Sequence, residues 1–177
     1  PARRAQLAEE LKTRGNAHYS HGDDAAAVDD YTAGLRACPE DDKTLRCALL
    51  SNRAAGHLRR KEHDLCIKDC NDALKLDASR AKCYYRRAAA REQQDSLEEA
   101  FKDLKICVQL EPTNKTAVNA ARRVKEKLTE KLKREKAFAT PAERLALQIC
   151  QCVETEELEE RKLANLFKAG ASLAIED

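Results

Sequence analysis

Five polar side chains stand at spacings that would let them act together on an acidic ligand. Lys12 and Asn16 are four residues apart, Lys82 and Arg86 are also four apart, and Asn52 lies between the two pairs. Residues four apart share one face of a helix, so each pair points the same way. A residue with two carboxylates needs several donors at once, and the amides donate without adding charge repulsion. The set indicates a receptor for carboxylates.

Cysteines could instead indicate a metal site. Cys66 and Cys70, with His63 nearby, form one group, and Cys150 and Cys152 form another. The first two cysteines fall at core positions of a repeat, the second two point to different faces of a helix, and four clustered ligands are lacking. We therefore expect reduced core thiols, no metal and no cofactor.

Nucleophilic catalysis by a Cys–His pair is the next alternative. His18, His21 and His57 lie in ordinary helical or turn sequence, and no motif joins any of them to a cysteine. We assign no catalytic residue and expect that the chain is not an enzyme.

The elements that must position the five residues are helices. Only 4% of the 177 residues are aromatic, and Gly and Pro total nine (5 + 4), whereas Ala, Leu, Lys, Arg and Glu dominate. This composition is typical of an all-α protein. No run approaches the 18 apolar residues of a membrane span, and the charged first ten residues do not resemble a secretory signal. We expect a cytoplasmic protein and, because Met is absent, a piece of a longer chain.

Self-similar segments predict a solenoid of helical pairs. Ala8, Cys47 and Ala81 occupy equivalent positions, so the spacings are 39 (47 − 8) and 34 (81 − 47) residues. The five extra residues fall within Pro39–Arg46, and we expect them to lengthen the first helix of the second repeat. Stacked pairs bury each other's apolar faces and bring their first helices to one concave surface.

The predicted organisation has two parts. Residues 1–138 form a repeat domain, with repeats at about 5–40, 44–78 and 79–112 and a capping helix at 113–138, in which Val118, Ala121, Val124, Leu128 and Leu132 recur at helical spacing. Residues 139–177 form a helical segment that opens another domain, because Pro141 starts a new helical pattern. The basic run 122–136 lacks aromatics and contains interspersed glutamates, so we expect a solvated helix and no nucleic-acid or membrane partner.

Residues 5–112 resemble the tetratricopeptide-repeat (TPR) family, which implies a right-handed solenoid. The strings LKTRGN, SNRAA and AKCYYRR match the two-carboxylate clamp of those members that bind the Glu-Glu-Val-Asp terminus of heat-shock proteins 70 and 90. The resemblance implies that Lys12, Asn16, Asn52 and Lys82 hold the two carboxylates of the final Asp, whereas Arg86 reaches further back. It also implies that two further residues, Tyr19 and Ala55, flank a hydrophobic pocket for the ligand's valine.

The segment 137–170 resembles the part that follows the TPRs in the UCS family of myosin chaperones, the uncoordinated-forty-five type. This resemblance implies an armadillo-like region next, and a cochaperone that couples heat-shock protein 90 to myosin through a domain beyond this chain. Two alternatives stay open: a TPR scaffold for internal peptides, and the TPR module of an immunophilin-like or phosphatase-like enzyme.

Overall fold

The structure, a computed structural model, describes residues 2–138, with side chains described as far as Glu135. These residues form seven helices and no strand, which confirms the predicted all-α class for this part of the chain. No described helix combines the length and apolar character needed to cross a bilayer. The predicted helices after Pro141 lie outside the described residues, as do Cys150 and Cys152.

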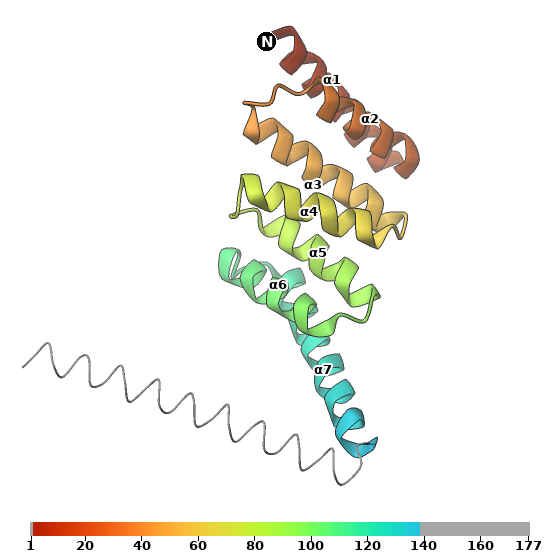
Figure 1. The fold of residues 1–177 in the computed structure, drawn as a ribbon, viewed down its shortest axis with the longest axis vertical. Coiled ribbons are helices and arrows are strands. Elements are labelled where there is room, and N and C mark those ends of the chain that lie inside the picture. The colour runs from red at the N-terminus through yellow and green to blue at the C-terminus, as the bar shows by residue number, and fades with distance from the viewer. Residues whose placement is uncertain (1, 139–177) are drawn as a thin grey trace, which may run out of the picture. The chain divides into compact units, whose positions relative to one another are not determined.

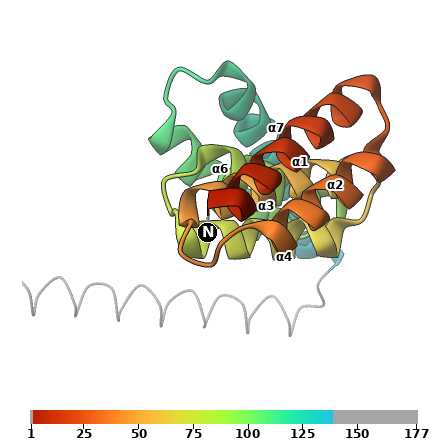
Figure 2. The same cartoon turned by 90° about the horizontal axis from the view of Figure 1, so that it is seen from above.

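The helices form three pairs followed by one longer helix (Figure 1). The pairs are α1 (Ala2–His21) with α2 (Asp24–Ala37), α3 (Lys43–Arg59) with α4 (His63–Leu76), and α5 (Ala81–Gln93) with α6 (Leu97–Leu110); α7 is Lys115–Phe138. Each pair contacts the next, and α3 also contacts both α1 and α5. The odd-numbered helices of the three pairs therefore form one continuous inner face. Seen from above, successive pairs are offset and not superposed (Figure 2).

Contacts divide the chain into two compact units, Pro1–Thr129 and Glu130–Asp177. All three helical pairs and the first half of α7 belong to the first unit. Only the end of α7 is described in the second unit. The assignment of residues 1–138 to one domain stays a prediction.

An ion pair that the sequence analysis did not anticipate recurs in every helical pair. An arginine of the inner helix binds an aspartate sixteen residues later on the outer helix, and the N–O distances are 2.5 to 2.7 Å. The three pairs are Arg14–Asp30, Arg53–Asp69 and Arg87–Asp103. The aspartates are at most 6% exposed, so each needs its arginine as counter-charge. The repeated pair ties the two helices of each repeat together.

The turns inside the pairs also repeat. Gly22, Lys61 and Asp95 occupy equivalent positions, and all three have positive φ, at 87°, 62° and 59°. This left-handed conformation reverses the chain between the two helices, and it is disfavoured for residues with a Cβ atom. At the second turn Lys61 makes the reversal, and its neighbour Glu62 is the N-cap of α4.

Small residues set how closely the helices approach. A Cβ atom on Gly15 would lie 2.7 Å from the Tyr31 ring, so the ring packs directly on the α1 backbone.

The predicted lengthening of the first helix of the second repeat is confirmed relative to the third repeat. Helix α3 begins at Lys43, four residues before Cys47 (47 − 43), whereas α5 begins at Ala81, the position equivalent to Cys47.

The buried stripe of α7 differs from the predicted one. Ala117, Ala120 and Val124 are at most 5% exposed, whereas Val118 and Leu132 are 42% and 41% exposed. Ala120 and Val124 pack against buried residues of α5 and α6. The prediction was right for Val124, and Ala121 and Leu128 pack partly buried against the same cluster. It was wrong for Val118 and Leu132 and missed Ala117 and Ala120, because close helix packing favours small residues.

Candidate peptide-binding site

The five residues predicted to bind carboxylates all lie on the inner helices. Lys12 and Asn16 are on α1, Asn52 is on α3, and Lys82 and Arg86 are on α5. Because α3 contacts both α1 and α5, residues up to 74 positions apart (86 − 12) share one face. We call this face, with the pocket described below, the inner groove.

The two carboxamides are held in a defined orientation by the buried Tyr31, which the sequence analysis did not name. Asn52 Nδ2 donates to Asn16 Oδ1 at 3.0 Å, and the Tyr31 hydroxyl donates to the same oxygen at 2.8 Å. With its oxygen occupied twice, Asn16 turns its amide N–H groups toward a ligand, and Asn52 retains one free N–H. Burial raises the pKa of Tyr31 to about 12, so its hydroxyl stays a donor at neutral pH.

The three cations differ in how they are held. Lys12 forms an ion pair with Glu9 on the same helix at 2.5 Å, so a ligand must replace that partner. Lys82 is exposed and has no ion-pair partner among residues 2–135. Arg86 donates through Nη1 to the Ser51 carbonyl and hydroxyl, both at 2.6 Å, which leaves Nε and Nη2 for a ligand. Arg86 is therefore anchored before any ligand arrives.

A pocket of about 360 Å³ opens next to these cations. Tyr19, Ala55, Lys82 and Arg86 all line it, so four of the seven predicted site residues meet in one cavity. Its other walls were missed by sequence reasoning: Leu58, Arg59, Ala81, Tyr85, Cys107, Glu111, Asn114 and Thr116. Spacing could have indicated Arg59, which follows Asn52 by two helical turns, and Tyr85, which adjoins Arg86.

Arg59 forms one wall of this pocket. Its guanidinium lies 4.4 Å from the centre of the Tyr19 ring, and Nη1 donates to the Tyr19 carbonyl at 2.9 Å. Nε also lies 3.2 Å from Asp24 Oδ2, so Arg59 joins the end of α3 to the first helical pair. The stacking fixes the Tyr19 ring at the rim.

The groove has the chemistry of a receptor for anions. Lys12, Lys82, Arg59 and Arg86 bring four cations to the face, against the carboxylates of Glu9 and Glu111. The donors are two neutral amides, two ammonium groups and two guanidinium groups, and the charged ones bind carboxylates by charge-assisted hydrogen bonds.

The cysteines occupy core positions, as predicted for Cys66 and Cys70. All six cysteines of the described residues are free and buried, and both of these are 0% exposed. Burial raises the pKa of the Cys47 and Cys107 thiols, which keeps them protonated. Within residues 2–138 no group of three or more His, Cys, Asp or Glu side chains is arranged to hold a metal ion.

Comparison with curated proteins finds two kinds of relative. The chain is 35% identical over 124 residues to protein unc-45 homolog B of Danio rerio, covering 70% of this chain and 13% of that protein. It is 38% identical over 127 residues to RNA polymerase II-associated protein 3 of Homo sapiens, covering 72% of this chain and 18% of that protein. The chain thus spans less than a fifth of these relatives. No protein-family model matches it.

Solved structures show the same likeness. The first TPR of Spaghetti (RPAP3) bound to the HSP90 peptide SRMEEVD is 38% identical with a TM-score of 0.65, covering 71% of this chain and 98% of that one. The myosin chaperone UNC-45 from C. elegans, in complex with an Hsp90 peptide, is 34% identical with a TM-score of 0.70, covering 75% of this chain and 15% of that one. The second TPR domain of human RPAP3, in complex with the HSP70 peptide SGPTIEEVD, is 32% identical with a TM-score of 0.60, covering 71% of this chain and 98% of that one.

The first of these structures is matched over 98% of its length at 38% identity. The helical pairs, their repeat spacing and these identities together show that the chain belongs to the tetratricopeptide-repeat family, with the TPR domains of RPAP3 and UNC-45 among its homologues.

Proposed function

We propose that this chain is a peptide-binding cochaperone adaptor that captures the C-terminal Glu-Glu-Val-Asp tail of heat-shock protein 90 or heat-shock protein 70. It acts by binding and not by catalysis, and it works in the cytoplasm, where it meets these chaperones. The related TPR structures bound to HSP90 and HSP70 peptides support this proposal.

The observation that carries the proposal is the amide pair of the inner groove. Asn16 and Asn52 are oriented before binding, because Tyr31 and Asn52 both occupy the Asn16 oxygen. Donors fixed in advance lose little conformational entropy on binding. Each charge-assisted hydrogen bond to a carboxylate contributes about 1.5–3 kcal/mol.

Each residue then has a role in the proposed complex. The final Asp of the tail places its main-chain and side-chain carboxylates among the amides of Asn16 and Asn52 and the ammonium groups of Lys12 and Lys82. Arg86 binds a carboxylate or carbonyl further back.

The hydrophobic part of the tail needs a separate place in the complex. The ligand's valine packs in the pocket beside Tyr19 and Ala55, which line one cavity with Lys82 and Arg86. This role follows from the resemblance to the clamp family and rests on the apolar wall that Ala55 and the Tyr19 ring provide.

The client is a further part of the proposal. The UNC-45 likeness favours myosin, held by a part of the protein outside this chain. An internal-peptide scaffold or the TPR module of an enzyme would use the same fold, and these are the competing outcomes of the test below.

Calorimetric titration of the 177-residue chain with the peptide Met-Glu-Glu-Val-Asp tests the proposal, and the same peptide with an amidated C-terminus is the matched control. We expect micromolar binding of the free acid and loss of binding on amidation, because the amide removes one of the two terminal carboxylates. Equal affinity for both peptides would favour an internal-peptide scaffold, and no binding to either would contradict tail capture.

A further inference from the structure

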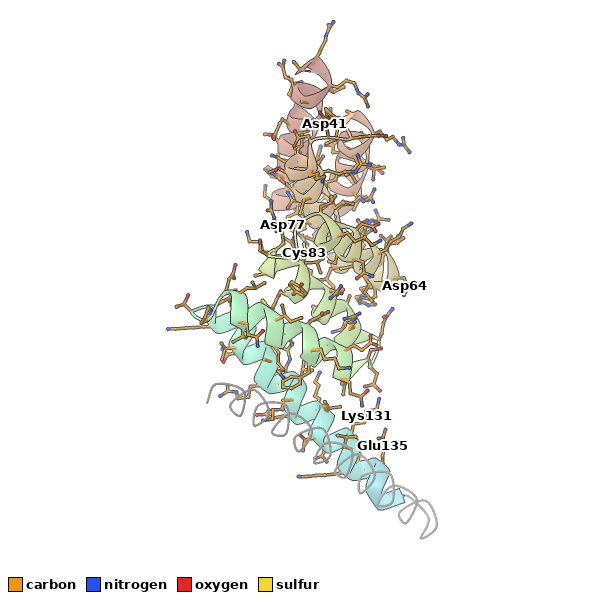
Figure 3. The ribbon with its side chains drawn as sticks, turned by 60° about the vertical axis from the view of Figure 1, so that its left-hand side comes forward. Asp41, Asp64, Asp77, Cys83, Lys131 and Glu135 are labelled. Atoms are coloured by element: carbon orange, nitrogen blue, oxygen red, sulfur yellow. The ribbon has the colours of Figure 1, made fainter. Side chains whose placement is uncertain are left out.

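A second and larger cavity lies on the other side of α3. It measures about 710 Å³ and shares no lining residue with the pocket of the inner groove. Its walls come from α2, α3, α4 and, through Arg4, the start of α1, and they lie near the connections between pairs. Asp41 and Asp77 mark these connections in Figure 3, whereas Asp64 marks the opposite end of α4. We call this space the basic cavity.

The two sites lie on different sides of α3. Arg46, Leu50 and Arg53 line the basic cavity, whereas Asn52 and Ala55 face the inner groove. Leu50 and Asn52 are two residues apart, which is about 200° around a helix. A ligand in one site therefore leaves the other open.

The lining of the basic cavity is strongly cationic. Six cations stand against two carboxylates, a local excess of four charges (6 − 2): Arg4, Arg36, Arg46, Arg53, Lys68 and Lys75 against Glu40 and Asp72. Three of the cations have partners: Arg53 binds Asp69 at 2.7 Å, Lys75 binds Asp72 at 2.8 Å, and Arg4 donates to the Arg36 carbonyl at 3.4 Å.

Three of the cations are not neutralised by the fold. Arg36, Arg46 and Lys68 have no side-chain hydrogen bond or ion pair among the described residues, and they come from three different helices. Three unpaired like charges around one hollow repel one another, so an anionic ligand would lower their energy.

The floor of the cavity is apolar. Leu50 is 7% exposed, the Cys38 thiol is 2% exposed, and Leu35 and Leu76 complete the surface. A small inorganic anion would gain nothing from these leucines, and a nucleic acid would find no aromatic ring to stack on. A peptide that carries acids and a leucine-sized side chain matches both the rim and the floor, and the volume lies within the range of natural ligand pockets.

We propose that the basic cavity binds an acidic peptide segment with an interspersed apolar side chain, recognised internally and without a free C-terminus. The cations at the rim bind the carboxylates, and the leucine floor receives the apolar side chain. The proposal is independent of tail capture in the inner groove, and both ligands can bind at once because their residues differ.

The test uses the 177-residue chain and the probe acetyl-Glu-Glu-Leu-Glu-Glu-Leu-amide, whose blocked end prevents carboxylate capture in the groove. Titration followed by amide NMR shifts should move signals of α2, of the Leu50 side of α3 and of α4, both with and without saturating Met-Glu-Glu-Val-Asp. Replacing the leucines of the probe with serine should weaken binding, because the floor is apolar.

Charge reversal supplies the matched variants. The triple change Arg36→Glu, Arg46→Glu and Lys68→Glu should weaken probe binding at least about tenfold and leave tail binding intact. The control Lys102→Glu, Lys105→Glu and Lys125→Glu removes the same charge from exposed positions on α6 and α7 and should change probe affinity by less than about twofold. Should the triple variant fail to fold, Arg36→Gln and Lys68→Gln at exposed side chains give the same comparison.

Four outcomes would overturn the proposal. These are no probe binding, shifts confined to the inner groove, equal weakening in both triple variants, and equal shifts of the same signals by sulfate at matched charge. Absence of probe binding would exclude a peptide site, and shifts confined to the groove would mean that the probe binds there. Equal weakening in both triple variants would mean that the net charge of the protein alone attracts the probe. Equal shifts with sulfate would make the cavity an inorganic-anion site. The first, third and fourth leave tail capture untouched, whereas binding of the blocked probe in the groove would also favour an internal-peptide scaffold there.

Discussion

The inner groove and the basic cavity both present cations from several helices, but only the groove fixes its donors in advance. In the groove, Tyr31 and Asn52 orient Asn16, and Ser51 anchors Arg86. In the cavity, Arg36, Arg46 and Lys68 stand around an apolar floor, and no side chain among residues 2–135 hydrogen-bonds to hold them. Fixed donors select one ligand geometry, whereas cations without partners select charge and composition. The groove should therefore be the more specific site and the cavity the more tolerant one.

The largest expected effect is on the free energy of unfolding, and it distinguishes Arg53, which is paired with Asp69, from the unpaired cations of the cavity. Arg53→Ala should lower the free energy of unfolding by about 3 kcal/mol, because it leaves the 3%-exposed Asp69 without its arginine. Lys68→Ala, in the same cavity but exposed, should change it by less than about 0.5 kcal/mol. Urea unfolding followed by circular dichroism measures both, and similar values would mean that Arg53 is not structural.

The next effect concerns the groove alone. Lys82→Ala or Arg86→Ala should weaken binding of Met-Glu-Glu-Val-Asp by about 2–3 kcal/mol, roughly 30- to 150-fold, without loss of helicity. Calorimetry gives the affinity, and circular dichroism checks the fold. Lys102→Ala on α6 serves as the control. Unchanged affinity in both groove variants would disprove the carboxylate clamp.

Salt should distinguish the two sites. Raising NaCl from about 50 to 500 mM should weaken the acidic probe roughly tenfold, because exposed, unpaired cations are screened. The affinity of the tail peptide should fall by a smaller factor, because its ion pairs with the groove are partly desolvated. Titrations of both peptides across this range measure the slopes, and a steeper slope for the tail peptide would reverse the comparison.

The smallest effect tests the fixed amide pair. Tyr31→Phe keeps the ring that packs on Gly15 but removes the hydroxyl bond to Asn16, so tail binding should weaken by about 1 kcal/mol, roughly fivefold. Binding of the acidic probe should not change. Tyr84→Phe, a tyrosine outside both cavities, is the control for hydroxyl loss. Equal tail affinity in the Tyr31 and Tyr84 variants would mean that Asn16 needs no such support.

Sequence reasoning found the inner face because that face depends on spacing within single helices. The i, i+4 pairs on α1 and α5 and the repeat period together predict that Lys12, Asn16, Lys82 and Arg86 share one side. The buried stripe of α7 was partly wrong, because the approach of α7 to α5 and α6 favours Ala117 and Ala120 over the larger Val118.

Interactions between helices were the part that the sequence analysis missed. The Arg–Asp pair at sixteen residues recurs three times in the sequence, so the repeat itself could have revealed it. The hydroxyl bond of Tyr31 to Asn16 was missed, because it depends on how deeply α2 packs against α1.

The sequence by itself determined the helical class, the repeat period, the longer α3 and the helices that carry the five carboxylate-binding candidates. These follow from composition and from periodicity along one chain segment, which local physics decides. Only the tertiary structure decided that Asn52 bonds Asn16, that Arg59 stacks on Tyr19, and that three free cations surround one cavity. Each of these depends on the distance and angle between helices, which side-chain packing sets and which no spacing within a single helix encodes.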